Sequence, residues 1–174
     1  MSRGLGDVYK RQLKMNQGLF DNQKHVIAFR SGSFKDSVDC QKLYTDVIYT
    51  KIQNLWDIFS KNAIELEADF ELITKGRTSQ KANSTNNILG EENLFIEEGA
   101  LINCAIINAS KGPIYIGKDA EIMEGTIIRG PFALCEASQT KLGAKIYGPT
   151  TVGPYSKVGG KLTNVVIFGY SNKG

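Results

Sequence analysis

The second half of the chain repeats a six-residue pattern, in which an aliphatic residue is followed four positions later by a small one. Clear copies begin at Ile96, Ile116, Ile122, Leu134 and Val152, and weaker copies begin at Ile102, Ile128, Leu142 and Val158. The register holds from 116 to 134 and resumes at 152, 158 and 164. Such a period fits neither an α-helix nor a strand with simple side-chain alternation.

A six-residue period predicts a solenoid with three flat faces, one hexapeptide per face and about 18 residues per coil. The aliphatic residue points to the axis, and the small residue fits beside it. Residues 88–174 then form roughly four to five coils. Slips in the spacing predict outward loops at Asn108–Pro113, Gln139–Lys141 and Tyr147–Thr151. The alternative, a sandwich of ordinary strands with Gly-rich turns, is disfavoured by the hexads in unbroken register.

Residues 13–75 have a mixed α/β pattern. The apolar run Val26–Phe29, closed by Gly32, is typical of a strand. Further along, apolar residues recur at helical spacing. They are Leu43, Val47, Ile48, Ile52, Leu55 and Phe59. Because Asn54 and Asp57 resemble a new N-cap, we expect two helices, the second from about residue 55 to 66.

Polar and atypical segments set the domain boundaries. Residues 76–87 are almost free of apolar side chains and are predicted to be a linker before the solenoid. Residues 1–12 lack periodicity, and Asp7–Gln12 resembles the translation of a transposase adaptor used in sequencing, so we predict an artefact there. The pattern breaks off at Gly174 within a repeat, so we expect a fragment truncated at both ends.

The composition argues against several classes of function. A chain with 41% hydrophobic and 22% charged residues is typical of a globular protein, and no apolar run suits a membrane helix. A net charge of +3 gives no support to nucleic-acid binding. Three cysteines without a CxxC pair, and no signal-like segment, predict a location in a reducing cytoplasm. The single histidine, His25, excludes a three-histidine metal site on the solenoid, and the scattered threonines exclude an ice-binding ladder.

Three segments carry a family resemblance. They are WDIFSKNAIELEADFELITKGR (Trp56–Arg77), GPIYIGKDAEIMEGTIIRGPFALCE (Gly112–Glu136), and GPYSKVGG with FGYSNKG (within Gly153–Gly174). They resemble the GlmU-like sugar-phosphate nucleotidyltransferase/acetyltransferase proteins of Bacteroidetes, described as UDP-N-acetylglucosamine diphosphorylase/glucosamine-1-phosphate N-acetyltransferase. The resemblance implies a mainly β fold: a left-handed parallel β-helix, or hexapeptide-repeat solenoid, preceded by the α/β C-terminal remnant of a nucleotidyltransferase domain.

The resemblance implies two reactions that supply a nucleotide sugar for the cell envelope. The first domain joins a sugar 1-phosphate, such as N-acetylglucosamine 1-phosphate, to a nucleotide with the help of Mg²⁺. The family's Gly-rich loop and metal-binding aspartates have no match in this sequence, so no metal ligand is assigned. The solenoid transfers acetyl from acetyl-CoA to glucosamine 1-phosphate, at sites between the subunits of a homotrimer. The general-base histidine is expected just beyond Gly174, so the chain alone is expected to be inactive.

The residues carried over as substrate-binding are basic or polar. They are Tyr170, Ser171, Asn172, Lys173, Lys157, Lys161 and Arg129. Their cations would bind a phosphate. Two departures leave the sugar, the nucleotide and the acyl donor open. Leu134–Glu136 stands where the better-known uridylyltransferases carry arginine, and Gly159–Gly160 stands where they carry lysines. The alternative is a non-catalytic platform for oligomerisation or regulation of a sugar nucleotidyltransferase, and neither alternative involves a nucleic acid or a membrane.

Overall fold

The computed structural model describes residues 13–32, 40–46 and 49–174. These residues divide into a first unit that ends at Lys51 and a second unit, residues 52–174. The artefact predicted for residues 1–12 lies outside the described residues, as do Val47 and Ile48 of the first predicted helix.

The first unit is a three-stranded sheet in the order β2–β1–β3. Its strands are β1 (Gln17–Phe20), β2 (Val26–Arg30) and β3 (Gln41–Tyr44). β2 confirms the strand predicted around residues 26–29. The helix predicted to include Leu43 is wrong at this position, because residues 41–44 pair in parallel with β1. Here the pairing of the backbone with β1 outweighs the local apolar spacing.

The second predicted helix is present and longer than expected. It consists of α2 (Asp57–Ser60) and α3 (Asn62–Thr74), which are separated by Lys61. The carboxylate of Asp57 accepts the backbone N–H groups of Gln53 (2.8 Å) and Asn54 (3.0 Å). These two hydrogen bonds hold the pKa of Asp57 below its ordinary value. The turn before α2 is therefore stabilised in the way that a capping box stabilises a helix start.

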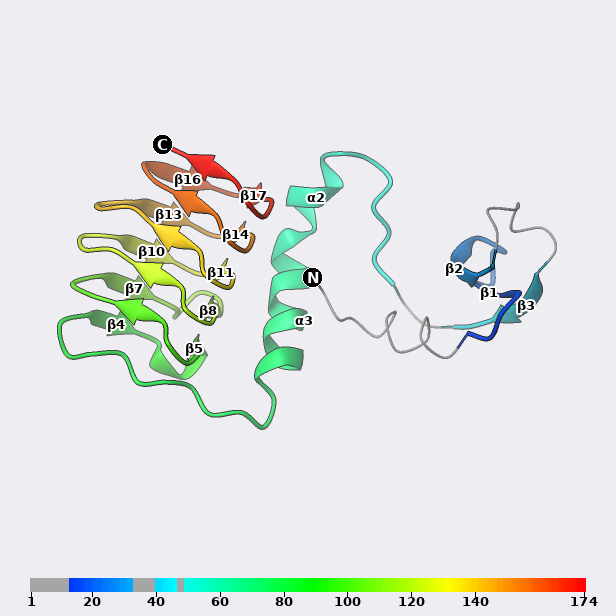
Figure 1. Ribbon diagram of the computed structural model, residues 1–174, viewed down its shortest axis with the longest axis horizontal. Helices are drawn as coiled ribbons and strands as arrows, with labels where there is room; N and C mark the ends of the chain where they lie inside the picture. Colours follow the sequence, from blue (N-terminus) through cyan, green and yellow to red (C-terminus); the bar gives the residue numbers. More distant parts are fainter. Residues whose placement is uncertain (1–12, 33–39, 47–48) are drawn as a thin grey trace. The chain divides into compact units, whose positions relative to one another are not determined.

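The remainder of the second unit is a parallel β-solenoid of five coils, which confirms the mainly β fold class (Figure 1). Each coil contributes one strand to each of three flat faces. Face 1 holds β4 (Asn87–Leu89), β7 (Ile106–Asn108), β10 (Ile127–Arg129), β13 (Lys145–Tyr147) and β16 (Lys161–Thr163). Face 2 holds β5 (Leu94–Ile96), β8 (Ile114–Ile116), β11 (Phe132–Leu134), β14 (Thr150–Val152) and β17 (Val166–Ile167). Face 3 holds β6 (Leu101–Ile102), β9 (Glu121–Ile122), β12 (Gln139–Thr140), β15 (Lys157–Val158) and β18 (Asn172–Lys173), and the 3₁₀ turn η2 (Glu91–Asn93) joins β4 to β5.

The axis of the solenoid is filled by every sixth side chain from residue 116 to residue 158. These side chains are Ile116, Ile122, Ile128, Leu134, Thr140, Ile146, Val152 and Val158, and each is at most 1% exposed. Strand pairing places Ile116, Leu134 and Val152 directly above one another, so one coil takes 18 residues here. The position four residues after each axial residue is also buried, and it is small except at Phe132 and Leu162.

This continuous register corrects three predictions. Leu142 is 68% exposed and is not an axial residue, because Thr140 and Ile146 occupy the axial positions on either side of it. The loops predicted at 139–141 and 147–151 are wrong, since β12 and β14 form there. Asn164 is exposed, and Leu162 is the buried residue of face 1 in the last coil. By contrast, the loop predicted at 108–113 is confirmed. The turn between β7 and β8 spans residues 109–113, whereas the corresponding turn between β10 and β11 spans only residues 130–131.

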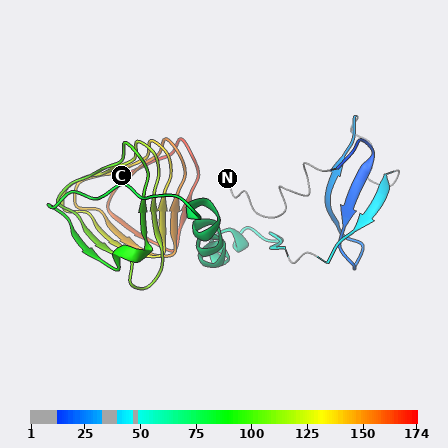
Figure 2. The ribbon, with the colours of Figure 1, turned by 90° about the horizontal axis from the view of Figure 1, so that it is seen from below.

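Helix α3 lies along the outside of face 2, as Figure 2 shows in a view along the stack of coils. Near its start, Thr151 Oγ1 donates a hydrogen bond to Asn62 Oδ1 (2.8 Å). Beyond its end, Arg77 Nη2 pairs with Glu97 Oε2 (2.5 Å), and the hydroxyl of Tyr115 donates to Glu97 Oε1 (2.7 Å). Polar contacts at both ends therefore fix α3 across several coils.

The contact of Glu97 with Arg77 and Tyr115 favours the ionised form of the Glu97 carboxylate. Burial by itself raises the pKa of Glu97, but the hydrogen bonds from Arg77 and Tyr115 outweigh it and lower the pKa below the ordinary value. The pKa of Tyr115 is raised, because burial and the neighbouring Glu97 carboxylate both disfavour the charged phenolate.

Replacing Ile122 by Asp should lower the free energy of unfolding by about 3 kcal/mol or more, because it buries a charge without a partner. Leu142→Asp is the matched control: it should change the free energy of unfolding by less than about 0.5 kcal/mol, since Leu142 faces solvent. Urea denaturation followed by circular dichroism measures both values. Equal effects of the two substitutions would contradict the axial register.

Glu97→Gln should lower the free energy of unfolding by about 2 kcal/mol at pH 7, because a charge-assisted hydrogen-bond pair is lost. The folded state lowers the pKa of Glu97, so its stabilisation is present above the ordinary pKa of 4.5 and is lost as the pH falls through the folded-state value. The variant should therefore lose less stability than the wild type on acidification below pH 4.5. Glu98→Gln, at the exposed neighbouring position, should retain the wild-type acid profile in the same denaturation series.

Candidate functional site

Five lysines line the turn from face 3 to face 1 in the last three coils. Lys141 follows β12 and Lys145 begins β13; Lys157 and Lys161 lie in β15 and β16, on either side of the next turn; Lys173 is in β18. We call this set the lysine edge. Lys145, Lys157 and Lys161 are exposed, whereas Lys141 and Lys173 are half-buried.

The sequence around the lysine edge contains no acidic residue. Residues 137–174 contain five lysines and neither Asp nor Glu, whereas residues 88–136 contain eight acidic and three basic residues. Because coils follow one another in sequence order, charge is segregated along the solenoid: a net −5 in residues 88–136 and a net +5 in residues 137–174. Glu136, between β11 and β12, and Glu124, whose carbonyl oxygen accepts the N–H of Gly143, lie in the coils next to the edge, but residues 137–174 add no Asp or Glu, so the edge has an excess of positive charge and is suited to an anion.

The two half-buried lysines are held in place by neighbouring coils. Lys141 Nζ donates to Asn172 Oδ1 (3.0 Å). Its aliphatic chain covers Gly159, where an added Cβ would lie 3.1 Å from Lys141 Cδ. Lys173 is paired with Val158 in the strand register and so takes an axial position, from which its Nζ donates to the carbonyl oxygen of Gly159 (3.1 Å). These two lysines thus shape the edge around Gly159.

Four of the predicted substrate-binding residues lie together at the end of the solenoid. Lys157 is paired with Asn172 across face 3, beside Lys173. Ser171 precedes Asn172, and its backbone N–H donates to Ser156 Oγ (3.0 Å). A phosphate bound at Lys157 would therefore lie close to Ser171, Asn172 and Lys173 of the last coil.

The other predicted residues lie further away or have aromatic partners. Tyr170 is 80% exposed in the preceding turn and stacks on Tyr155, with ring centroids 5.2 Å apart. Lys161 Nζ lies 5.4 Å from the ring centroid of Tyr147. Arg129 is paired with Tyr147 in the strand register, at the opposite end of the face 1 strands from Lys145 and Lys161. The structure thus does not bring Arg129 to the lysine edge.

Sequence reasoning missed Lys141 and Lys145. A break in register assumed at residues 139–141 assigned Lys141 to a loop. The signal that could have found it is the 18-residue spacing between Lys141 and Gly159, which are stacked in consecutive coils. Lys145 would have followed from the same register, because it pairs with Lys161 in the next strand of face 1.

The first unit has a separate polar cluster where β1 ends. Asp21 accepts hydrogen bonds from the backbone N–H of His25 (2.7 Å) and from the hydroxyl of Tyr49 (2.9 Å), and its carboxylate contacts His25 Nδ1 at 3.0 Å. Partial burial raises the pKa of Asp21, but these hydrogen bonds lower it to below its ordinary value. His25 is thus an exposed histidine paired with Asp21.

The described residues do not fit a magnesium site. The carboxylate of Asp21 is occupied by His25 and Tyr49, and Asp46 accepts a hydrogen bond from Asn22. Within residues 13–32, 40–46 and 49–174, no group of three or more His, Cys, Asp or Glu side chains is placed to hold a metal ion.

The thiol of Cys135 has a pKa raised by burial, which lowers its reactivity at neutral pH.

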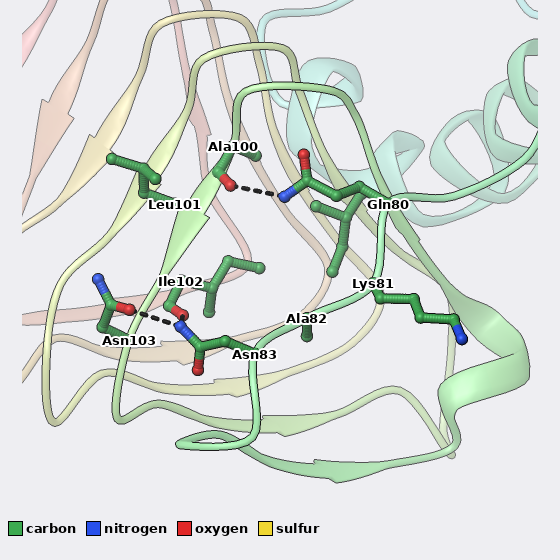
Figure 3. Close-up of a pocket in the computed structure, with 9 residues that line it drawn as sticks. Gln80, Lys81, Ala82, Asn83, Ala100, Leu101, Ile102 and Asn103 are labelled. Carbon is green, nitrogen blue, oxygen red and sulfur yellow. Dashed lines mark hydrogen bonds between the residues drawn. The ribbon is translucent and has the colours of Figure 1, made fainter.

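A hollow of about 230 Å³ lies at the opposite end of the solenoid, under the segment that precedes β4 (Figure 3). Gln80 Nε2 donates to the carbonyl oxygen of Ala100 (3.0 Å), and Asn83 Nδ2 donates to that of Ile102 (2.9 Å). These amides form hydrogen bonds with backbone carbonyl groups at the edge of the first coil. Without them, the unpaired edge could pair with a strand of another chain. The predicted linker thus caps the solenoid, and its amides are already engaged.

The family comparison concerns the first part of the chain. Residues 9–78 match the family model described as sugar nucleotidyl transferase, which is less than half of the chain. No curated protein and no solved structure matches the chain. Among the described residues, no helix is both long and apolar enough to cross a membrane. The match, which extends beyond the end of α3, supports a relation of this chain to the sugar nucleotidyltransferases.

Proposed function

We propose that this chain is part of a bifunctional transferase that makes a nucleotide sugar for the cell envelope, with the lysine edge binding a phosphorylated amino sugar. The observation that supports this proposal is that one chain joins a segment matching sugar nucleotidyltransferases to a solenoid whose last 38 residues, 137–174, contain five lysines and no Asp or Glu. The sugar phosphate in this proposal is glucosamine 1-phosphate, which the whole protein would acetylate and then join to a nucleotide.

Phosphate binding follows from the chemistry of the edge. The ammonium group of Lys157 would form charge-assisted hydrogen bonds with the phosphate oxygens, and that of Lys161 would join it on leaving the ring of Tyr147, over which it lies in this structure. Asn172 and Ser171, in the last coil, offer groups that can bind sugar hydroxyls. Residues 137–174 contain no Asp or Glu side chain that could neutralise these lysines.

The residues of this chain would bind and orient the sugar phosphate, and they would not remove the proton from its amine. His25 is in the first unit and paired with Asp21, and the solenoid has no histidine. Acetyl-CoA would supply the acetyl group as a thioester. The described residues do not define the pocket for acetyl-CoA, and they do not fit Mg²⁺.

A second candidate function is a platform for oligomerisation, through which the solenoid would form a homotrimer and support a nucleotidyltransferase without catalysing acyl transfer. Exposed apolar side chains on face 1 favour it. They are Leu89, Ile106, Ile127 and Tyr147, each between 42% and 53% exposed. Face 2 is covered by α3, which leaves face 1 as the open face with an apolar surface. Self-association through face 1 is common to both candidates.

Binding of glucosamine 1-phosphate to the full chain tests the first candidate. Isothermal titration calorimetry should detect binding of glucosamine 1-phosphate and much weaker binding of glucosamine, which lacks the phosphate. Lys157→Gln together with Lys161→Gln should weaken the binding about tenfold or more, as expected for the loss of two charge-assisted contacts.

The matched control is Lys111→Gln together with Lys118→Gln, which removes the same charge from exposed positions in earlier coils and should leave the affinity unchanged. Equal affinities in all three proteins would contradict binding at the lysine edge. A chain that self-associates but binds no sugar phosphate would favour the platform.

A further inference from the structure

The outward column of face 3 carries opposite charges on the two sides of its middle coil. Strand register places Leu101, Glu121, Gln139, Lys157 and Asn172 beside one another, one residue per coil. Glu121 and Gln139 are half-buried, and the other three are exposed. Gln139 Nε2 donates a hydrogen bond to Glu121 Oε2, so the amide holds the carboxylate in the column. The column is therefore acidic in the second coil, neutral in the third and basic in the fourth.

The helix of the second unit leaves face 3 open. α3 lies along face 2 and packs on β14 of that face (Figure 2). Residues 80–83 lie over the edge of the first coil, where Gln80 and Asn83 bind the carbonyl oxygens of Ala100 and Ile102 (Figure 3). Within residues 52–174, the middle of face 3 is thus accessible to another molecule.

The order of these charges distinguishes two ways in which two copies of the chain can meet across face 3. If the coils of both copies run in the same direction, Glu121 lies level with Glu121 and Lys157 with Lys157, and both levels repel. A two-fold axis along β12 reverses the order of the coils in the second copy. It keeps Gln139 opposite Gln139 and brings Glu121 of each copy opposite Lys157 of the other. The column therefore favours antiparallel pairing and opposes parallel pairing.

The charge of the whole solenoid favours the same arrangement. Residues 88–136 carry a net −5 and residues 137–174 a net +5, so antiparallel copies place the acidic coils of one beside the basic coils of the other. The charges of the middle coil lie outside the column. Glu136 is in the turn before β12, and Lys141 follows β12 with its Nζ bound to Asn172 Oδ1 (3.0 Å). A second copy thus supplies the carboxylates that residues 137–174 lack.

We propose that face 3 is an interface between two antiparallel copies of this chain, held by reciprocal ion pairs of Glu121 with Lys157 on either side of Gln139. The inference goes beyond the proposed function and does not rest on it, because the platform uses face 1. Two-fold symmetry makes each charge act twice, once in each ion pair. Because an exposed ion pair stabilises only slightly and is screened by salt, the dimer is weak and dissociates as the ionic strength rises.

Sedimentation equilibrium of the full chain tests the interface, without sugar phosphate, because Lys157 is also assigned to its binding. The wild type should dimerise, and raising the salt from about 0.05 M to about 0.5 M should lower the association constant about tenfold. At low salt, Glu121→Lys and Lys157→Glu should each lower it about tenfold or more, since both pairs become like-charged. The chain with both substitutions should associate like the wild type, because opposite charges meet again.

Glu92→Lys is the matched control: it reverses an exposed charge in η2, away from face 3, and should retain the wild-type association and salt response. Circular dichroism confirms the fold of every variant. An equal mixture of the Glu121→Lys and Lys157→Glu chains should associate like the wild type, because one copy then carries lysine and the other glutamate at both positions.

Three results would overturn the proposal. One is a wild type that is monomeric at low salt, and another is a wild type whose association Glu121→Lys leaves unchanged, as self-association through face 1 alone would. The third is a mixture that associates more tightly than the wild type, because like levels then face each other and the copies are parallel. Binding of glucosamine 1-phosphate by calorimetry is judged separately.

Discussion

The structure depends on the burial of one side chain in every six along the axis of the solenoid. The buried residues four positions after these axial side chains complete this core, since each face is one strand thick and each strand is two or three residues long. Stacking in register removes the axial residues between Ile116 and Val158 from water and pairs each middle strand on both sides. Hydrophobic burial and strand pairing require the same 18-residue step. A change in the length of a coil would therefore disrupt the burial of the axial residues and the strand pairing at the same time.

Much of this fold could be predicted from the sequence, since a period of six has few structural solutions. The errors have a common physical cause. Thr140 occupies an axial position although its side chain is polar, and in the interior it lies 3.3 Å from Thr126, oxygen to oxygen. Assigning it to an outward loop, and starting the next repeat at Leu142, broke the register and produced two loops that do not exist. β3 could not be predicted from local spacing, because its partner β1 lies more than twenty residues earlier.

The candidate site was partly predictable for the same reason. Lys157 and Lys161 were carried over from the family resemblance, but the 18-residue register was needed to add Lys141 and Lys145. Arg129 was carried over from a family resemblance, and the register places it at the opposite end of the face 1 strands. Side-chain contacts such as that of Lys141 with Asn172, thirty-one residues apart, follow only from the stacked coils. The contact of Arg77 with Glu97 likewise depends on how α3 packs against face 2.

Amide hydrogen exchange, followed residue by residue by NMR, tests the axial stack most directly. The account predicts that the slowest exchange belongs to the middle strands of all three faces, around Ile116, Ile128, Leu134 and Val152, and repeats every 18 residues. Protection should decrease towards β16, β17 and β18, whose outer edges have no further coil in this structure. Uniformly fast exchange through residues 114–158, or protection with a period other than 18, would contradict the account.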